Sequence, residues 1–586
     1  MHVVATAGHV DHGKSTLVRA LTGRDPDRLA EERRRGLTIE LGYAWTPLPD
    51  GTALAFVDVP GHQRFLATML AGVGPVPAAL LVVAADEGWR RQTGEHVAAL
   101  EALGVEHTLV AVTRSDLADP AAAAHDVRAR LAGRLPITEV VAVSGRTGQG
   151  LPQLLAALGR LVTALPDPDP AAAVRLWVDR VFTVAGAGTV VTGTLGQGTL
   201  RVGNTLELVG RPVRVRGLQS LEVPHAEVSA TARVAVALRG IERDDVRRGD
   251  ALLTPGVWRP AAQLDVRIVG SSDRVPGGLV LHVGAAAVPV RTRPLAPGTV
   301  RLTLDRPLPM RTGDRVVLRD PGEQRVLAGA VVLDPDPPAL RRRGAARARA
   351  AALQHMPDAA AQLARRGSAT RAELAALGVL AEGAPDPDGS VAVGGLLVDG
   401  ARWAGWLLAV PAAVQAHLQL HPDAAGVPRD VLVRELALPS AAALDALLAR
   451  LPALHSAAGR VAPAGRGLPP TATAALARLH ERWAERPFDA PGAEELVPLG
   501  LTRPVLGALV GAGVVLRLPG ELVLPPDAGP RALALLGGIP QPFTASAARQ
   551  ALGTSRRVAL PLLEHLDARR LTLRAADGTR RLAAVR

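Results

Sequence analysis

Three different spacings of hydrophobic positions divide the chain into three parts. In the first part, short uninterrupted apolar runs such as VVATA (3–7) and LVAV (109–112) alternate with stretches in which apolar residues recur every three or four positions. Uninterrupted runs are typical of strands buried on both faces, and the longer period is typical of amphipathic helices. This alternation predicts an α/β domain with a parallel sheet over residues 1–168.

The second part of the chain changes to a period of two. After a proline-rich linker at 165–170, apolar and polar residues alternate in stretches such as RLWVDRVFTV and ARVAVALRG, which are separated by glycine-containing turns. Alternation of this kind predicts antiparallel strands with one buried face. We expect two small β-barrels, over residues 174–256 and 259–337.

In the third part, residues 340–586, one order of elements recurs: a short helix, a turn, a second helix and two short strands around a turn. This order is typical of a winged helix, and it predicts four copies at 340–404, 405–466, 467–528 and 529–586. The prediction depends on the pattern, because the copies share little sequence identity. The expected fold class is therefore multidomain: an α/β domain, two antiparallel β-barrels and α+β winged-helix repeats.

Composition narrows the classes of function. The net charge is +12 and the pI is about 11.2, which favours a polyanionic partner such as nucleic acid, although an arginine-rich soluble surface is the alternative. The chain has no cysteine, which excludes disulfides, thiolate metal sites and cysteine nucleophiles. We find no signal peptide and no apolar run of membrane-spanning length, so we expect a cytoplasmic monomer without membrane contact.

The first predicted strand runs into GHVDHGKST, residues 8–16, and an amphipathic helix follows. Gly8, Gly13, Lys14 and Ser15 form a Walker A pattern in its strand–loop–helix context, which a plain glycine turn does not explain. In such a loop, backbone N–H groups hold phosphates, the lysine reaches the β- and γ-phosphates and the serine hydroxyl binds Mg²⁺. Lys14 is the single lysine of the chain, and a narrow phosphate loop that cannot accept a planar guanidinium explains why it is retained.

Further polar residues follow later predicted strands, where α/β sheets bind ligands. Asp58 can hold Mg²⁺ through water, Gly61 offers a backbone N–H to a γ-phosphate, and Thr38 can close over the metal ion. Taken alone, Asp58 is also compatible with a helix cap or a turn. In this order along the chain, Ser15, Thr38 and Asp58 predict a magnesium site.

The base is indicated by Thr113-Arg114-Ser115-Asp116, which ends another buried strand. A carboxylate at Asp116 can accept hydrogen bonds from the N1–H and 2-amino groups of guanine, a donor pair that adenine lacks. Ser144, in a short loop after the next strand, suits the guanine O6. Although Asp116 alone is also compatible with a turn, the set favours GTP as the cofactor, and the first domain is predicted to be a P-loop GTPase.

The segments GHVDHGKST, RGLTIELG, DVPGHQRF and AADEGWRRQTGEHVAAL resemble the translational GTPases related to elongation factor Tu, over residues 1 to about 165. The resemblance implies that His62 orients the attacking water and that Val10 and Leu37 flank it as an apolar gate; from the sequence alone, His62 is also compatible with a surface histidine. The complete predicted nucleotide site is Gly8, Asp11, His12, Gly13, Lys14, Ser15, Thr16, Asp58, Gly61, Thr113, Arg114, Asp116 and Ser144.

The chain departs from that family at one motif. The family's guanine motif begins Asn-Lys, where this chain has Thr113-Arg114. Because Asp116 remains, we expect guanine specificity to survive with an altered affinity. Two barrels after the GTPase domain also resemble elongation factor Tu, in which they hold aminoacyl-tRNA.

Two shorter segments, ADEGW and LDPDPP, are similar to those of bacterial selenocysteine-specific elongation factors. The resemblance implies that basic side chains of the first barrel face the aminoacyl group, and local sequence assigns them to Arg180 and Arg233. A selenol is largely ionised at neutral pH and a serine hydroxyl is not, so a buried guanidinium can distinguish the two. The alternative is that both arginines belong to the ordinary barrel surface.

Positive charge gathers at the end of the chain. Residues 547–586 contain nine arginines and three acidic residues, a net +6, which is half of the total +12. Arg556 and Arg557 fall in the first turn of a predicted helix, where the helix dipole disfavours cations, and Arg574, Arg580 and Arg581 flank a predicted wing turn. A basic first turn and a basic wing can hold a phosphate backbone, although a solvated arginine-rich tail is the alternative.

The resemblance implies that this last winged helix binds the messenger RNA hairpin that marks a UGA codon for selenocysteine. The resulting prediction is a GTPase that carries selenocysteyl-tRNA to the ribosome while bound to that hairpin. One alternative is a general translational GTPase or tRNA-delivery factor with an unrelated nucleic-acid-binding tail. The other is a nucleic-acid-binding regulator in which the GTPase domain is a switch.

Overall fold

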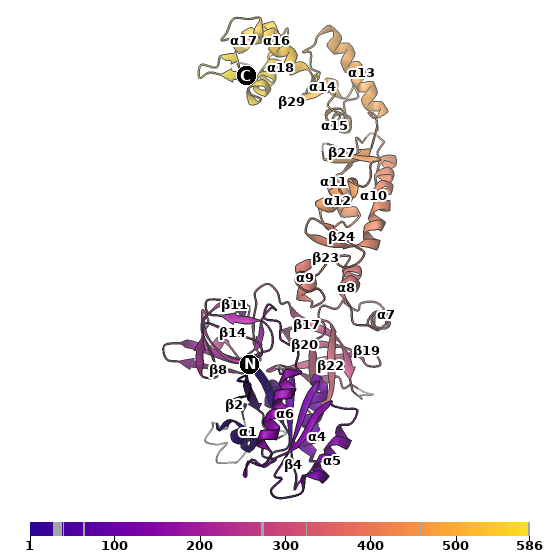
Figure 1. The fold of residues 1–586 in the computed structure, drawn as a ribbon. Coiled ribbons are helices and arrows are strands. Elements are labelled where there is room, and N and C mark those ends of the chain that lie inside the picture. The colour runs from indigo at the N-terminus through magenta and orange to yellow at the C-terminus, as the bar shows by residue number, and fades with distance from the viewer. Residues whose placement is uncertain are drawn as a thin grey trace. The chain divides into compact units, whose positions relative to one another are not determined.

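A computed structural model describes residues 1–26, 38, 40–62, 65–74, 76–270, 275–323, 325–422, 424–457 and 459–583 (Figure 1). These residues form two compact units. The first unit consists of residues 1–362 and 370–385, and the second consists of 363–369 and 386–586.

The first unit begins with a six-stranded sheet in the order β2-β3-β1-β4-β5-β6. Its strands are β1 (His2–Ala7), β2 (Gly42–Pro47), β3 (Ala53–Asp58), β4 (Ala78–Ala84), β5 (His107–Thr113) and β6 (Ile137–Ala142). Strand β2 runs antiparallel to β3, and the other neighbours are parallel. The predicted apolar runs VVATA and LVAV lie in the central strands β1 and β5.

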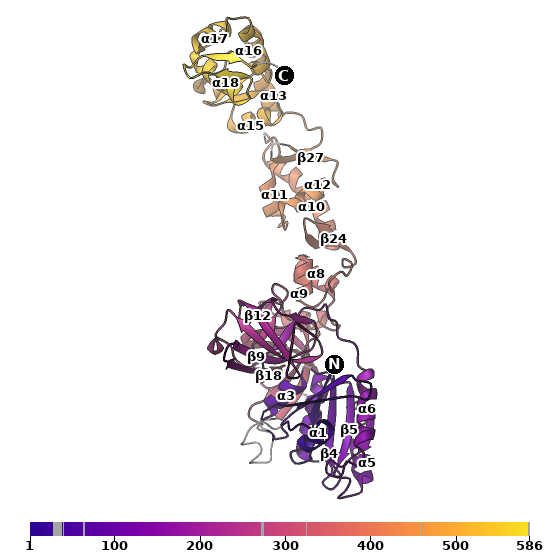
Figure 2. The same cartoon turned by 60° about the vertical axis from the view of Figure 1, so that its left-hand side comes forward.

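Helices cover both faces of this sheet (Figures 1 and 2). Val3 and Ala5 of β1 belong to one core with α3 (Leu66–Val73), α4 (Arg91–Leu103) and α5 (Pro120–Leu131). Val4, between them, belongs to the opposite core with α1 (Lys14–Thr22) and α6 (Leu151–Thr163). Because both faces are covered, the strands are apolar throughout, as their uninterrupted runs predict.

The first barrel domain is an antiparallel sheet with the main path β7-β16-β11-β12-β15-β9-β8, with β13 paired to β12 and β10 paired to β14 beside it. Its strands close over one apolar core. At Gly193 of β9, a Cβ would lie 2.5 Å from the carbonyl oxygen of Trp177 in β7, so a glycine allows this close approach between strands. The strands are β7 (Arg175–Trp177), β8 (Arg180–Val184), β9 (Gly188–Leu195), β10 (Thr199–Arg201), β11 (Thr205–Leu208), β12 (Arg211–Ser220), β13 (Val223–His225), β14 (Glu227–Ser229), β15 (Ala232–Arg239) and β16 (Ala251–Leu253).

The second barrel is closed, in the order β17-β20-β19-β18-β21-β22. Its strands are β17 (Pro260–Val269), β18 (Gly278–Val283), β19 (Ala286–Ala296), β20 (Thr299–Pro309), β21 (Arg315–Asp320) and β22 (Arg325–Asp334). The alternating residues that predicted these strands, among them Val288, Val290, Leu302 and Leu304, fill the interior.

The basic helix after the second barrel, α7 (Ala345–Ala352), packs against the barrel. Arg349 of α7 is buried and forms ion pairs with Asp265 of β17, at 2.7 Å, and with Asp334 of β22. Arg301 of β20 pairs with the same Asp265 at 2.7 Å. The sequence pattern predicts this helix as part of the first winged helix, but the structure attaches it to the barrel through a buried ion network.

Helices and hairpins alternate in the rest of the chain. The first copy contains α8 (Ala359–Arg366), β23 (Ser368–Thr370), α9 (Arg371–Ala376), β24 (Ser390–Val393) and β25 (Leu396–Asp399), and it is divided between the two units. The second has α10 (Gly400–Leu420), β26 (Val427–Pro428), α11 (Arg429–Glu435), α12 (Ala441–Leu448), β27 (Leu454–Ala457) and β28 (Arg460–Pro463). Because α10 is continuous, the boundary expected between residues 404 and 405 falls inside a helix.

The last two copies, like the second, each have three helices and a hairpin, one helix more than the pattern predicted. The third has α13 (Pro470–Glu485), α14 (Ala493–Leu496), α15 (Arg503–Gly511), β29 (Leu516–Leu518) and β30 (Leu522–Leu524). The fourth has α16 (Ala528–Gly537), α17 (Ala545–Ala551), α18 (Arg556–Ala568), β31 (Thr572–Arg574) and β32 (Arg580–Leu582). Among the described residues, no helix combines the length and the apolar character that crossing a membrane requires.

Candidate functional site

The loop between β1 and α1 has the backbone that the Walker A pattern requires. Gly8 has φ +133°, and a Cβ there would lie 2.2 Å from the carbonyl oxygen of Val82 in β4, so no other residue fits without a shift. Gly13 has φ +80° and precedes the first turn of α1, where Thr16 is exposed. The loop thus continues directly into the N-terminus of α1, and backbone amides at a helix N-terminus favour bound phosphate.

Lys14 is the first residue of α1, and its side chain lies inside this loop. Its ammonium donates hydrogen bonds to the carbonyls of Gly8, at 3.1 Å, and His9, at 2.8 Å. Gly61, after β3, comes so close that a Cβ would lie 2.6 Å from the Val10 nitrogen and 2.7 Å from the Lys14 Nζ. Lys14 and Gly61, which are both predicted to contact the γ-phosphate, therefore lie next to each other.

The three residues predicted for the metal ion also meet. The Ser15 hydroxyl donates to an Asp58 oxygen at 2.7 Å and lies 3.1 Å from the Thr38 hydroxyl. The Thr6 hydroxyl donates to the other Asp58 oxygen at 2.6 Å and fixes the carboxylate. An all-oxygen set of two hydroxyls and a carboxylate at the phosphate end of the loop suits Mg²⁺.

The predicted catalytic residues are placed only in part. His62 is half-buried, and its ring is tilted against Phe65 with 6.1 Å between the centroids. Val10 is half-buried in the loop next to Gly61. Leu37, the other side of the expected gate, lies outside the described residues.

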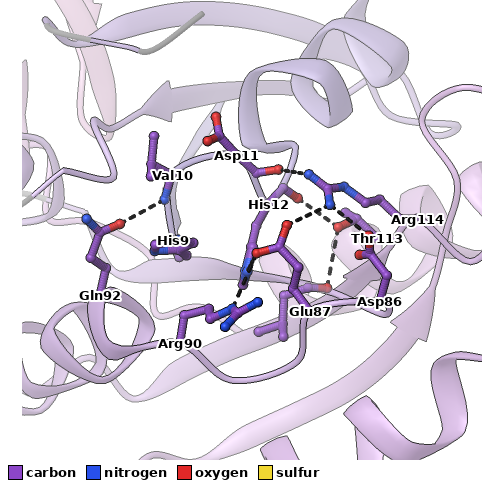
Figure 3. Close-up of polar contacts among 12 residues, drawn as sticks. His9, Val10, Asp11, His12, Asp86, Glu87, Arg90, Gln92, Thr113 and Arg114 are labelled. Carbon is purple, nitrogen blue, oxygen red and sulfur yellow. Dashed lines mark hydrogen bonds and ion pairs between the residues drawn. The ribbon is translucent and has the colours of Figure 1, made fainter. Parts of the chain in front are cut away.

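Helix α4 supports the loop from behind, a role that sequence analysis missed. Gln92 Oε1 accepts a hydrogen bond from the Val10 amide at 3.1 Å, and His96 Nδ1 accepts one from the Gly8 amide at 3.1 Å (Figure 3 shows Gln92 and Val10). Residues four apart lie on one face of a helix. The spacing in QTGEH was therefore the available signal, but nothing in the sequence named the amides as partners.

Two histidines beneath the loop are neutral at pH 7. Burial, assisted by the Lys14 charge, lowers the pKa of His96 to about 3. Burial and the neighbouring His9 lower the pKa of His12 to about 4. A neutral His96 can accept the Gly8 amide hydrogen bond, which a protonated ring cannot do.

The predicted base site lies at the ends of β5 and β6. A hydrogen bond from Ser144 lowers the pKa of the exposed Asp116, so this carboxylate is ionised at neutral pH. The Ser144 hydroxyl in turn accepts hydrogen bonds from the amides of Arg146, at 3.3 Å, and Thr147, at 3.1 Å. Thr113 and Arg114 point towards the phosphate loop, as Figure 3 shows.

The two arginines predicted for the aminoacyl pocket line one cavity of about 210 Å³ between β2 and the first barrel. Arg233 pairs with Asp179 through both terminal nitrogens, one of them at 2.7 Å, and its guanidinium lies 4.0 Å from the Tyr43 ring centroid. Arg180 pairs with Glu40 at 3.0 Å and donates to the Leu41 carbonyl at 2.6 Å. Neither side chain is an ordinary solvated surface arginine.

The five arginines predicted for RNA fall into three groups. Arg556, Arg574 and Arg581 are exposed on α18 and its hairpin. Arg557 is also exposed and donates to the Ala490 carbonyl at 2.8 Å, so it contacts the loop before α14. Arg580 differs from expectation: it is buried and paired with Asp567 of α18 at 2.8 Å, so it fastens the hairpin to the helix and does not face solvent.

Comparison with known proteins identifies the family. The profile "Elongation factor Tu GTP binding domain" matches residues 1–164, and "Elongation factor Tu domain 2" matches 188–253. Elongation factor Tu 2 of Streptomyces avermitilis is 33% identical over 374 residues, which cover 56% of this chain and 95% of that protein. The chain belongs to the elongation factor Tu family of translational GTPases.

Within that family, the chain resembles the selenocysteine-specific elongation factors. "Selenocysteine-specific elongation factor, beta-barrel domain" matches residues 278–339, and "Elongation factor SelB, winged helix" matches 536–581. The selenocysteine-specific elongation factor of Escherichia coli (strain K12) is 40% identical over 57% of this chain and 56% of that protein. The chain thus spans about half the length of the curated selenocysteine-specific relatives it matches.

Solved structures agree with this assignment. The crystal structure of a bacterial selenocysteine-specific elongation factor EF-Sec superposes with a TM-score of 0.79 at 25% identity, covering 100% of both chains. The fold class and the family resemblance predicted from the sequence are confirmed.

Proposed function

We propose that this protein is a GTP-dependent elongation factor that delivers selenocysteyl-tRNA to the ribosome at UGA codons while its C-terminal winged helix holds a messenger RNA hairpin. The loop residues 8–16 would hold the phosphates of GTP, and Asp116 with Ser144 would hold guanine. Ser15, Thr38 and Asp58 would hold Mg²⁺, which neutralises charge that develops on the phosphates. His62 would orient the attacking water, with Val10 and Leu37 as its gate.

One observation carries this proposal: Thr38 contacts the metal site, and Glu40 and Leu41, close to it in sequence, contact an arginine of the pocket. Thr38 lies 3.1 Å from the Ser15 hydroxyl, and two residues further on Glu40 lies 3.0 Å from Arg180. The Leu41 carbonyl holds the same arginine at 2.6 Å. Loss of the γ-phosphate that Thr38 senses would therefore release the contacts that hold Arg180 in the lining of the pocket, which is how GTP hydrolysis can release a bound aminoacyl group.

The chemistry of the pocket favours an anionic aminoacyl group. Asp179 fixes the orientation of Arg233, and the aromatic rings of Tyr43 and Trp45 line the same cavity. A charge-assisted hydrogen bond from a guanidinium in such a place stabilises a selenolate more than a serine hydroxyl. We expect selenocysteyl-tRNA to be preferred over seryl-tRNA on the same tRNA.

The test is hydrolysis of the ester bond in the presence of the protein and GTP. Selenocysteyl-tRNA should be protected, and seryl-tRNA on the same tRNA should hydrolyse as it does without protein. An Arg180→Met variant should lose this protection and still bind GTP. Equal protection of both esters would favour the alternative of a general tRNA-delivery factor.

A further inference from the structure

The side chain of Arg114 connects three places around the nucleotide site. Its Nη1 donates to Asp86 at 2.9 Å and to Glu87 at 2.8 Å, and its Nη2 donates to the Asp11 carbonyl in the phosphate loop (Figure 3). Asp86 and Glu87 follow β4, and Arg114 follows β5. Arg114 therefore ties the ends of two neighbouring strands to the loop between β1 and α1.

The preceding residue, Thr113, holds the next loop carbonyl. Its hydroxyl donates to the His12 carbonyl at 2.7 Å. The ring of His12 lies fully buried beneath, with its Nε2 3.7 Å from a carboxylate oxygen of Glu87. Two consecutive carbonyls of the loop, those of Asp11 and His12, are thus held by two consecutive residues at the end of β5.

The backbone at both ends of this contact is strained. Asp11 has φ 65° and Arg114 has φ 56°, a region that residues other than glycine seldom adopt. Strained conformations of this kind persist where surrounding contacts hold them, and they gather at functional sites. The hydrogen bonds of Arg114 supply such contacts at the loop.

The two carboxylates determine where the guanidinium lies. Burial would lower the pKa of Arg114, but the hydrogen bonds to Asp86 and Glu87 raise it, so the charge is stabilised in place. Glu87 is itself held by Arg90 at 3.3 Å. Without the carboxylates, a long arginine side chain has many solvated rotamers and would hold the Asp11 carbonyl only part of the time.

A hydroxyl has one proton, and Thr113 uses it on the His12 carbonyl. An asparagine amide has two protons at this position, one for the loop and one for a ring nitrogen of the base. Thr113 therefore has no second proton to donate to the base, and recognition of guanine falls to Asp116 and Ser144.

We propose that Asp86 and Glu87 are positioning residues for the nucleotide. Acting through Arg114, they keep the phosphate loop in the conformation that binds phosphate. The loop then determines the affinity for the nucleotide, and Asp116 determines the preference for the base. This inference rests on the proposed binding of guanine nucleotides.

The test measures dissociation of a fluorescent GDP analogue from the full chain. Asp86→Asn with Glu87→Gln preserves shape and removes both charges; we expect dissociation about tenfold faster, because two charge-assisted hydrogen bonds are lost. The preference for GDP over XDP should not change. Asp116→Asn should instead change the base preference and shift it towards XDP. Xanthine has a carbonyl where guanine has the 2-amino group, and an asparagine amide can donate a hydrogen bond to that carbonyl.

Two further variants complete the design. Asp126→Asn, which breaks the exposed pair between Asp126 and Arg130 on α5, is the matched control and should dissociate GDP as the wild type does. Thr113→Asn should slow dissociation, since its amide supplies the missing donor. The single variants at Asp86 and Glu87 should give intermediate rates, and they decide the question if the double variant does not fold.

Different failures have different meanings. A wild-type chain that does not bind GDP would overturn the proposed function. A wild-type chain that binds GDP, together with carboxylate variants that dissociate it at the wild-type rate or with an altered base preference, would overturn this inference alone.

Discussion

At the scale of single residues, the phosphate loop depends on neutral histidines. His96 accepts the Gly8 amide hydrogen bond at 3.1 Å through a ring nitrogen that must be unprotonated. His12 lies beneath the loop with 0% of its surface exposed. Protonation of either ring places a charge on a side chain that burial removes from water, and for His96 it also adds a second positive charge near Lys14 and replaces an acceptor with a second donor. Because the unfolded chain protonates these rings more readily than the folded loop does, the stability of the loop should fall in mild acid.

We predict that the GTPase domain loses stability between pH 7 and pH 5. The pKa of each histidine is 6.5 in the unfolded chain and falls on folding to about 3 for His96 and about 4 for His12. The unfolded state thus binds more protons, so stability is full above pH 6.5 and falls as the pH drops, by about 2 kcal/mol per histidine at pH 5. Pulsed hydrogen exchange of β1 and β4 peptides in urea measures the loss.

The His96→Gln variant is the control for this prediction. Glutamine retains an acceptor for the Gly8 amide but does not titrate, so between pH 7 and pH 5 the variant should lose about 2 kcal/mol less stability than the wild type. Identical losses in the two proteins would contradict the assignment to His96.

The nucleotide site shows what a sequence can predict about single residues. Ser15, Thr38 and Asp58 could be predicted as neighbours because motifs that follow parallel strands meet at one edge of the sheet. Gln92 and Asp86 could not, because each acts on a backbone group or on one arginine from a distant part of the chain. The prediction that Arg580 contacts RNA was wrong for a related reason. Its burial depends on an ion pair with Asp567, and no local sequence pattern indicates that pair.

At the scale of elements, helix α7 shows that a sequence pattern can predict a helix without predicting what the helix packs against. Its arginines are spaced like those of a solvated helix, and the sequence ALRRRGAARARAAALQ resembles a basic lead-in to the winged helices. Arg349 instead completes a network with Asp265, Asp334 and Arg301 in the second barrel. Strands and helices were predictable from the hydrophobic period. The packing of α7 against the second barrel was not, because it depends on three buried charged residues that come from three different strands.

We predict that Arg349→Ala detaches α7 from the barrel. Two carboxylates that are 0% exposed would lose a partner, and breaking a buried ion network in this way costs about 3–5 kcal/mol. Arg347→Ala, an exposed position two residues earlier on the same helix, should change stability by less than about 0.5 kcal/mol. Urea unfolding of both variants, followed by hydrogen exchange at β17 and β22, measures the difference.

At the scale of the whole molecule, the candidate sites are divided between the two compact units. The nucleotide site and the arginine pocket lie in the first unit, and the exposed arginines Arg556, Arg574 and Arg581 lie in the second. The division follows from the proposed task, since one part of such a factor would change with GTP hydrolysis while another holds the message. Attachment to the message, as proposed, would raise the local concentration of the factor at one codon.

This division predicts that hairpin binding can be weakened without change to the first unit. Replacing Arg556, Arg574 and Arg581 by alanine should lower affinity for the messenger RNA hairpin and reduce the slope of log affinity against log salt by about 2–3, because each lost phosphate contact removes nearly one unit. GTP binding and protection of selenocysteyl-tRNA should stay at wild-type values. The control carries the same loss of charge at Arg434, Arg450 and Arg486, exposed positions outside the fourth copy, and should keep the wild-type slope. If both triple variants lose the slope equally, the arginines act through net charge alone, and the predicted contact of α18 and its hairpin with RNA is wrong.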